Sequence, residues 1–188
     1  MNLSRSLATR VFALLPIVVG VVFAAPSAAQ ASEKYLSVTG YKQEKSNWCW
    51  AAAAEMIIKY HTGTVVSQCK LVKDGKNSSS CSNVTGTTSN VMNTLNKHGV
   101  NPGTDVVLDW AHVVAEMDTN RPVYSRIVWT SGGGHAHVVR GYYNVGYSYG
   151  VSYVDPLSGT TTSREWGTYA HNSEWNIASG SLIYLTRK

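Results

Sequence analysis

Cys49 is the residue of this sequence with the clearest potential for covalent chemistry. It is followed by Trp50 and then by four alanines, residues 51–54, which favour a helix. A short polar residue, Ser46 or Asn47, is suited to cap that helix with its side-chain oxygen. Cys49 would then lie in the first turn, where the positive end of the helix dipole favours a thiolate over a thiol. This position suits a nucleophile better than a buried structural cysteine.

A thiolate that attacks an acyl carbon needs three further kinds of group around it. An imidazole must hold the proton and pass it to the leaving group, another side chain must orient the imidazole, and hydrogen-bond donors must stabilise the oxyanion. The backbone N–H of Cys49 can serve as one oxyanion donor, and the amide of Gln43, six residues upstream, can serve as another. The alternative interpretation of Gln43 is a surface amide.

His135 and Asp155 are the candidates for the base and for the group that orients it. His135 opens a predicted strand after a run of glycines, and Asp155 ends the next predicted strand. If the hairpin turn is centred on residue 145, His135 lies ten residues before the centre and Asp155 ten residues after it. The two would then face each other. The alternative for Asp155 is a turn carboxylate that precedes Pro156.

His137 lies two residues after His135, so both side chains point to the same face of the predicted strand. This spacing allows two alternatives: His137 could be the base, or the two histidines could bind zinc with Cys49 as a third ligand. A zinc site would leave Gln43 and Asp155 without a role, so we expect neither a metal nor an organic cofactor. We expect His137 to be a partly buried strand residue near the site.

The N-terminus has the features of a secretory signal peptide. Arginines at positions 5 and 10 precede an apolar run over residues 11–25, and residues 29–31 fit the small-x-small pattern of a cleavage site. We expect residues 1–31 to be the signal peptide and residues 32–188 to form one domain. The apolar run is short for a membrane span, and an uncleaved anchor is the less favoured alternative. The protein is therefore predicted to be secreted, or to reside in the periplasm or cell envelope.

Cys69 and Cys81 are predicted to form a disulfide. They lie 12 residues apart on either side of a polar stretch, residues 73–80, that we expect to be a loop in an oxidising compartment. Closing that loop stabilises a fold by roughly 2–3 kcal/mol in the chain-entropy picture. Two free thiols or a metal clip are the alternatives. Three cysteines leave one unpaired, so Cys49 is the free thiol, which favours a functional reason for it.

Helical patterns occupy the first half of the chain and strand patterns the second. Helices are predicted from about residue 48 to 61, over 88–98 and over 110–118, and strands over 123–129, 135–142, 147–155, 160–164 and 182–186. Residues 165–179 fit neither pattern. Helices first and strands second in one domain predict an α+β fold.

At its candidate site residues the sequence resembles the papain-like cysteine peptidases. It is most similar to a compact bacterial branch that includes a secreted effector protease of plant pathogens. The matching motifs are Gln43-x5-Cys49-Trp50, His135-Ala136-x-Val138-Val139-x-Gly141-Tyr142 and Asp155-Pro156, which together span residues 43–156. Each motif is weak by itself, but the four site positions in this order and spacing are specific.

The resemblance implies that Cys49 is the nucleophile, His135 the general base, Asp155 the orienting residue and Gln43 an oxyanion donor. It also implies a helical N-terminal half packed on an antiparallel β-sheet or half-barrel C-terminal half, with the active-site cleft between them. The chain departs from the larger papain relatives in two ways. Ser46 stands where they carry a cysteine, and too few residues precede Cys49 for their inhibitory prosegment.

We therefore predict an exported cysteine peptidase that acts as a monomer on protein or peptide substrates. The formal net charge is +5, and because the leader holds two arginines and no acid, the remainder carries only +3, with its basic residues scattered. We expect no nucleic-acid partner and no stable membrane association after signal cleavage.

Two alternatives of other kinds remain at this stage. A cell-wall peptide amidase or endopeptidase of the Cys–His type typically carries Asp-Cys-Ser-Gly at its nucleophile, whereas residues 48–51 read Trp-Cys-Trp-Ala. A secreted binding module without catalysis could keep the same fold. The presence of a Gln, a Cys, a His and an Asp at the four site positions argues against that second alternative.

Overall fold

The computed structural model describes residues 31–188. The predicted signal peptide, residues 1–31, therefore lies outside the described residues except for its last position. Within the described part, no helix is long and apolar enough to cross a membrane.

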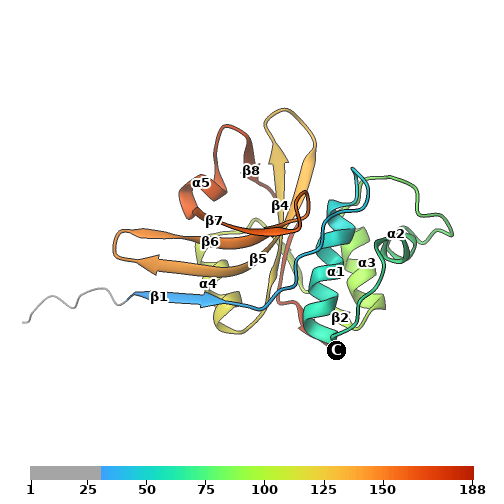
Figure 1. Cartoon of the computed structure of the whole chain (residues 1–188), viewed down its shortest axis with the longest axis horizontal. Helices are drawn as coiled ribbons and strands as arrows, with labels where there is room; N and C mark the ends of the chain where they lie inside the picture. Colours follow the sequence, from blue (N-terminus) through green and yellow to red (C-terminus); the bar gives the residue numbers. More distant parts are fainter. Residues whose placement is uncertain (1–30) are drawn as a thin grey trace, which may run out of the picture.

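The fold combines helices with antiparallel strands, which confirms the predicted α+β class (Figure 1). The helices are α1 (Cys49–Thr62), α2 (Gln68–Lys76), α3 (Thr88–Lys97), α4 (Trp110–Asp118) and α5 (Trp166–Ala170). The strands are β1 (Ser32–Tyr35), β2 (Val100–Asn101), β3 (Thr104–Val106), β4 (Val123–Trp129), β5 (Gly134–Val145), β6 (Ser148–Asp155), β7 (Thr160–Glu165), β8 (Trp175–Ile177), β9 (Ser181–Ile183) and β10 (Thr186–Arg187).

One large sheet carries most of the strands. Its order is β3-β9-β4-β5-β6-β7, with β1 paired to β5 and β8 paired to β4, while β10 and β2 form a small second sheet. In Figure 1, α1, α2 and α3 gather at one end of this sheet, and α4 and α5 lie beside it. The chain therefore places α1, the first helix, against β4 and β5, which come much later in the sequence.

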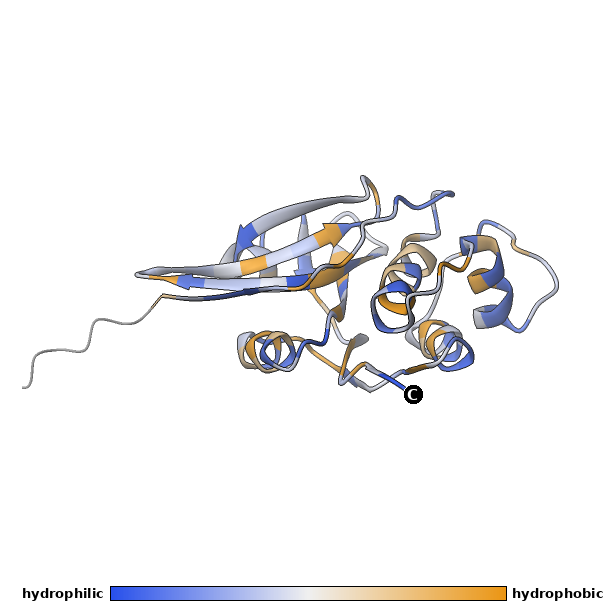
Figure 2. Ribbon diagram, turned by 60° about the horizontal axis from the view of Figure 1, so that its bottom comes forward, coloured by the Kyte–Doolittle hydropathy of each residue, from blue (hydrophilic) through white to orange (hydrophobic). Residues whose placement is uncertain are grey.

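Helix α1 is the buried centre of the helical region. Every residue from Trp50 to Ile58 is buried, and Ala51 to Ala54 have no exposed surface. Because alanine side chains are small, the sheet and the other helices can approach α1 closely on several sides. Figure 2 shows hydrophobic segments of the helices turned toward their neighbours and hydrophilic segments turned outward.

The predicted cap of α1 was wrong, although the helix itself was predicted correctly. The N-cap residue is Trp48, and no side chain caps the helix. Asn83 engages both predicted caps: its Oδ1 accepts from the backbone N–H of Asn47 at 3.0 Å, and its Nδ2 donates to Oγ of Ser46 at 2.9 Å. At the other end, Gly63 caps the helix in the left-handed conformation, with φ 77°.

The loop predicted over residues 73–80 was also wrong in its first half. Helix α2 continues to Lys76, because the Oγ of Ser67 accepts from the backbone N–H of Lys70 and Asn77 ends the helix in the left-handed conformation. Two apolar residues of α2, Leu71 and Val72, are fully buried. A short helix with so few apolar residues gives little periodic signal in the sequence.

The other predicted elements agree with the structure except near the C-terminus, whereas the short strands β1, β2 and β3 were not predicted. Helices α3 and α4 and strands β4 to β7 lie where predicted, within a few residues at their ends. The predicted strand over 182–186 is divided into β9 and β10, which belong to different sheets. Residues 165–179, which fitted no pattern, contain α5 and β8.

Candidate active site

A pocket of about 590 Å³ lies where the start of α1 meets β4 and β5. Its lining includes Cys49 from α1, Arg126 and Trp129 from β4, and His135 from β5. Cys49 is the first residue of α1, so its backbone N–H has no partner within the helix. The pocket thus joins the predicted nucleophile to the predicted base, and the two come from residues far apart in the sequence.

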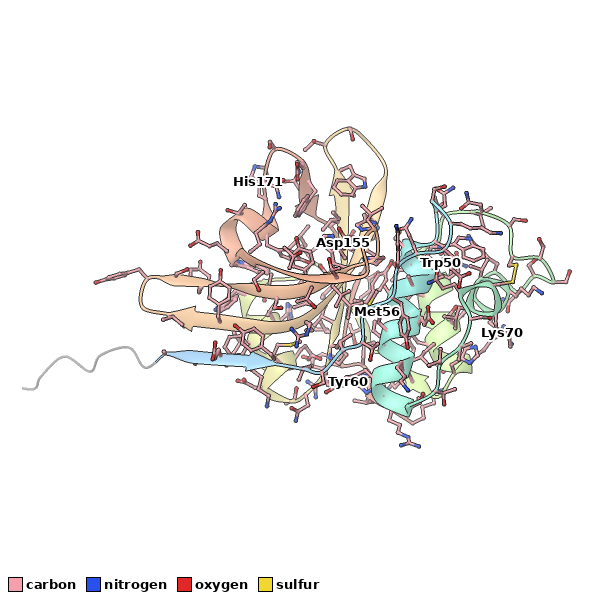
Figure 3. All side chains as sticks on the ribbon, viewed as in Figure 1. Trp50, Met56, Tyr60, Lys70, Asp155 and His171 are labelled. Atoms are coloured by element: carbon pink, nitrogen blue, oxygen red, sulfur yellow. A yellow bond between two sulfur atoms is a disulfide. The ribbon has the colours of Figure 1, made fainter. Side chains whose placement is uncertain are left out.

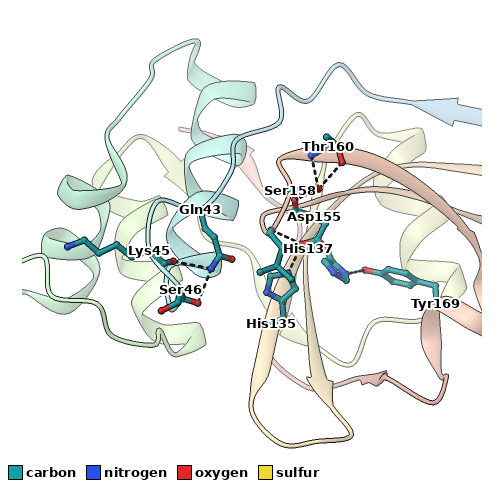
Figure 4. A network of polar contacts seen from close by, with 10 residues as sticks. Gln43, Lys45, Ser46, His135, His137, Asp155, Ser158, Thr160 and Tyr169 are labelled. Atoms are coloured by element: carbon teal, nitrogen blue, oxygen red, sulfur yellow. Dashed lines mark hydrogen bonds and ion pairs between the residues drawn. The ribbon is translucent and has the colours of Figure 1, made fainter.

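Asp155 holds one side of the His135 ring. The Nε2 atom of His135 lies 2.7 Å from Oδ1 of Asp155 (Figure 4). Burial by itself would raise the pKa of Asp155, but the hydrogen bonds from His135 and from the backbone N–H of Leu157 lower it below its ordinary value. The carboxylate is therefore ionised and fixes the orientation of the ring.

Cys49 lines the same pocket as His135 and affects the same ring. Burial by itself would lower the pKa of His135, but its hydrogen bonds to Asp155 and Cys49, together with the charges of both groups, raise that pKa to about 9. Because Nε2 is taken by Asp155, Nδ1 is the ring nitrogen that remains available to Cys49. The structure therefore gathers a thiol, an imidazole and a carboxylate at one place.

The pairing that brings His135 to Asp155 differs from the predicted one. Strands β5 and β6 pair Val138 with Val154, and the register shifts between Val139 and Gly141. One step beyond Val138 and Val154, Asp155 stands across from His137, so its carboxylate reaches His135 diagonally. The prediction that His135 and Asp155 face each other directly was therefore wrong, although their side chains do meet.

His137 is a fully buried strand residue, with 1% of its surface exposed, rather than a partly buried one. Its Nδ1 lies 3.4 Å from the hydroxyl of Tyr169, which in turn donates to Oγ of Ser125 at 2.8 Å. Burial, followed by the charge of His135, lowers the pKa of His137, so this ring is neutral. It packs edge-on against His135, with ring centres 5.1 Å apart.

The residues that could hold a metal ion in the structure differ from those of the zinc site considered above. Ligand-type atoms of His135, His137 and Asp155 lie within 4.8 Å of one another. The predicted set joined the two histidines to Cys49 instead. In the structure the Nε2 atom of His135, which a metal in this cluster would need, is held in the hydrogen bond to Asp155.

Gln43 lies in the loop that leads into α1, across from His135 in Figure 4. Its Nε2 donates to the carbonyl oxygens of Lys45, at 3.0 Å, and of Ser46, at 2.8 Å. Its Oε1 is buried and has no hydrogen-bond partner among the described residues. Both amide hydrogens are thus directed at carbonyl groups three and four residues before Cys49.

The two tryptophans beside Cys49 are both held by a segment outside the helix. The Nε1 of Trp48 donates to the carbonyl of Ser82, and the Nε1 of Trp50 donates to that of Val84. The ring of Trp50 also lies directly over Gly86. Both indoles therefore anchor the start of α1 to the segment 82–86, which sequence patterns did not single out.

Trp129 is a further part of the site that the sequence analysis did not identify. Its ring stacks on that of His135, with centres 5.5 Å apart and planes 23° from parallel. An aromatic plane beside a protonated imidazole stabilises the charged ring. A strand-end tryptophan has no sequence signature that would distinguish this contact from ordinary core packing.

Cys69 and Cys81 are paired as a disulfide in the structure, with Cα atoms 5.0 Å apart. Figure 3 shows this bond on the helical side of the molecule, away from the labelled Asp155. Cys49 is the unpaired cysteine. The pairing leaves the pocket with one free thiol.

The comparison with protein families agrees with this geometry. A model of the family described as "Papain-like cysteine protease AvrRpt2" matches residues 32–174, which is more than half of the chain. No curated protein matches the sequence. The matched range contains Gln43, Cys49, His135 and Asp155. The chain therefore belongs to this family of papain-like cysteine proteases, which are hydrolases.

Proposed function

We propose that the protein is an exported peptidase in which Cys49, His135 and Asp155 form a catalytic triad. The observation that carries this proposal is the His135 ring, whose Nε2 lies 2.7 Å from Oδ1 of Asp155 and whose pKa is raised by both Asp155 and Cys49. A nucleophile, a base and an orienting group in this order are what acyl transfer by a thiolate requires. The family match supports the same reaction class.

The contacts of His135 define a two-step reaction. With the proton on His135, the thiolate of Cys49 attacks the peptide carbonyl carbon, and the tetrahedral intermediate collapses as His135 protonates the departing amine. The product is an acyl-enzyme, a thioester at Cys49. His135 then takes a proton from water, the resulting hydroxide attacks the thioester, and the acid product leaves while the proton remains on His135 beside the restored thiolate.

Gln43 and the backbone N–H of Cys49 are the proposed oxyanion donors. The amide of Gln43 lies within the loop that enters α1, and its two carbonyl partners belong to Lys45 and Ser46. The proposed role requires one of its N–H groups to leave a carbonyl when substrate binds. The carbonyl would then turn toward water, which the exposed position of both residues permits.

The proposal extends to the organisation and location of the protein. We propose that the three N-terminal helices act as one half and the sheet as a half-barrel-like second half, because the pocket has lining residues from both. We further propose that the protein is exported as residues 32–188, that it is a monomer, and that Cys69 and Cys81 are oxidised to a disulfide. The family match begins at residue 32, where the predicted mature chain begins, and this supports the signal peptide.

Covalent labelling by an epoxide inhibitor of papain-like peptidases tests the proposed site. We expect the folded protein to gain one inhibitor mass on Cys49, because the ring of His135 supports the thiolate and supplies a proton to the opened epoxide. The gain should disappear in Cys49→Ser and fall at least about a hundredfold in rate in His135→Ala. His171→Ala is the matched control, since His171 is an exposed histidine outside the pocket.

Two results would contradict the proposal. One is the absence of labelling in a protein sample whose cooperative unfolding shows that it was folded. The other is labelling of Cys49 at the same rate in His135→Ala as in the control, since His135 would then not activate the thiol. Hydrolysis of an unfolded protein substrate, measured on the same four proteins, should follow the labelling rates.

A further inference from the structure

Arg126 brings a positive charge into the pocket that holds Cys49 and His135. It lies on β4, and no carboxylate is among the described residues that line the pocket. Across residues 31–188, its guanidinium forms no ion pair with an acidic side chain. Arg121 shows the usual arrangement by contrast, since its Nε and Nη2 each donate to Glu116 at 2.8 Å.

The Arg126 side chain is held in place by backbone on two sides. Its Nη1 donates to the carbonyl oxygen of Ser179 at 2.7 Å. A Cβ atom on Gly180 would lie 2.9 Å from Cδ of Arg126, so the aliphatic stem rests against this glycine. A Cβ atom on Gly134 would lie 3.7 Å from Nη2 and 3.9 Å from Nε. The Nε–Nη2 edge therefore lies beside the residue that precedes His135.

This edge has the chemistry of a carboxylate receptor. The Nε and Nη2 groups of arginine form a planar fork that matches the two oxygens of a carboxylate, and a guanidinium is weakly hydrated for a cation. Neither atom donates to another described residue. A half-buried, oriented and unpaired fork near the reacting atoms is suited to a negatively charged group of the substrate.

We propose that Arg126 binds a carboxylate of the peptide substrate and makes acidic peptides the preferred substrates of the enzyme. The proposal rests on the proposed peptidase function of the same pocket. The carboxylate can come from an Asp or Glu side chain close to the scissile bond or from a free C-terminus. In both cases the substrate supplies the negative charge that the pocket itself lacks.

Matched peptide pairs test this specificity. Each pair carries Glu or Gln at one of the positions on either side of the scissile bond, and a further pair ends in a free acid or in an amide. We expect wild-type kcat/KM to be roughly tenfold higher for the acidic member of one pair, as befits a partly exposed charge-assisted hydrogen bond. The pair that responds identifies a side-chain or a terminal carboxylate as the source.

Variants of Arg126 assign the preference to this side chain. Arg126→Gln should abolish the preference for the acidic peptide by slowing the cleavage of that peptide alone. Arg126→Lys should keep part of the preference. Arg126→Glu should reverse it in favour of a Lys-containing peptide. Arg187→Gln is the control, because Arg187 is exposed and outside the pocket. Reaction of Cys49 with iodoacetamide and the unfolding midpoint establish that each variant is folded with an available thiol.

Three results would overturn the proposal while leaving the peptidase function intact. They are equal cleavage of every pair by the wild type, an acidic preference that survives in Arg126→Gln, and an equal loss for both members of the responsive pair. The last would mean that Arg126 supports the Cys49 thiolate rather than the substrate. Failure of the wild type to cleave any peptide would instead reject the peptidase function, and with it this proposal.

Discussion

At the scale of single residues, His135 is governed by opposing effects, of which the favourable contacts prevail. Its burial disfavours the imidazolium, whereas the contacts to Asp155 and Cys49 favour it and raise the pKa to about 9. A protonated ring next to a thiol-bearing residue at neutral pH is what a thiolate–imidazolium resting state requires. The neighbouring His137, with a lowered pKa and no contact to Cys49, is the less suitable base.

The pH dependence of activity follows from this raised pKa. We expect the alkaline limb of kcat/KM to lie near pH 9, where His135 loses its proton. Asp155→Asn should move that limb to lower pH and reduce kcat/KM at pH 7 by at least about tenfold, because burial is then opposed by fewer favourable contacts. A pH–rate profile of both proteins measures the shift, and an unchanged limb would contradict it.

The same residue also affects stability, with a defined sign. The folded-state pKa of His135 is higher than its ordinary value of 6.5, so its protonation stabilises the folded state. This stabilisation is fully present at a pH below about 6.5. This contribution is lost as the pH rises through about 9. Unfolding midpoints should therefore fall over this interval in the wild type and fall less in Asp155→Asn.

Sequence patterns identified the residues that the structure brings together at the pocket, but not their exact partners. Cys49, His135 and Asp155 could be found because few residue types do this chemistry and the hairpin turn limited which could meet. The diagonal approach of Asp155 could not be found, since it depends on the register shift near Gly141. The carbonyl contacts of Gln43 arise from loop geometry that no local pattern encodes.

At the scale of elements, the start of α1 depends on a segment outside the helix. Asn83 bonds to residues 46 and 47, and the carbonyls of Ser82 and Val84 accept from the indoles of Trp48 and Trp50. These contacts replace the side-chain cap that the sequence predicted. The orientation of Cys49 is therefore set partly by residues 82–84, which lie more than thirty positions later.

Gly86→Ala tests this support. A Cβ atom on Gly86 would collide with the ring of Trp50, so we expect a loss of about 1–3 kcal/mol in the free energy of unfolding and slower labelling of Cys49. Gly167→Ala is the matched control: nothing lies within 4 Å of its added Cβ, and alanine favours the helix α5. Urea unfolding compares them, and equal stabilities would show that Trp50 does not support the site.

Elements with strong periodicity or clear caps were the predictable ones. Helix α4 begins where Asp109 accepts from the backbone N–H of His112, and β4 has the bounds that its sequence predicted. Strand β1 and helices α2 and α5 were missed because their short, polar or aromatic sequences are ordered by partners elsewhere. For example, β1 takes its strand form by pairing with β5.

At the scale of the whole molecule, the helical region and the sheet must each be held rigidly for the pocket to persist. The bond between Cys69 and Cys81 fixes the beginning of the segment that anchors α1, and Nζ of Lys45 donates to the carbonyl of Cys81. Strand β1, at the proposed mature N-terminus, pairs along residues 141–144 of β5. Export and oxidation, as proposed, would thus both act on parts of the fold that position the proposed catalytic residues.

Thiol counting and N-terminal analysis of the exported protein test this last connection. We expect the secreted chain to begin at Ser32 and, when unfolded without reductant, to titrate one thiol, that of Cys49. Reduction should lower the free energy of unfolding by roughly 2–3 kcal/mol, since the disulfide closes a loop of about a dozen residues. The double variant Cys69→Ser, Cys81→Ser is the control, because reductant should leave its stability unchanged. Three titratable thiols in the exported chain would show that the pair remains reduced, and the contribution of the disulfide to the site would have to be abandoned.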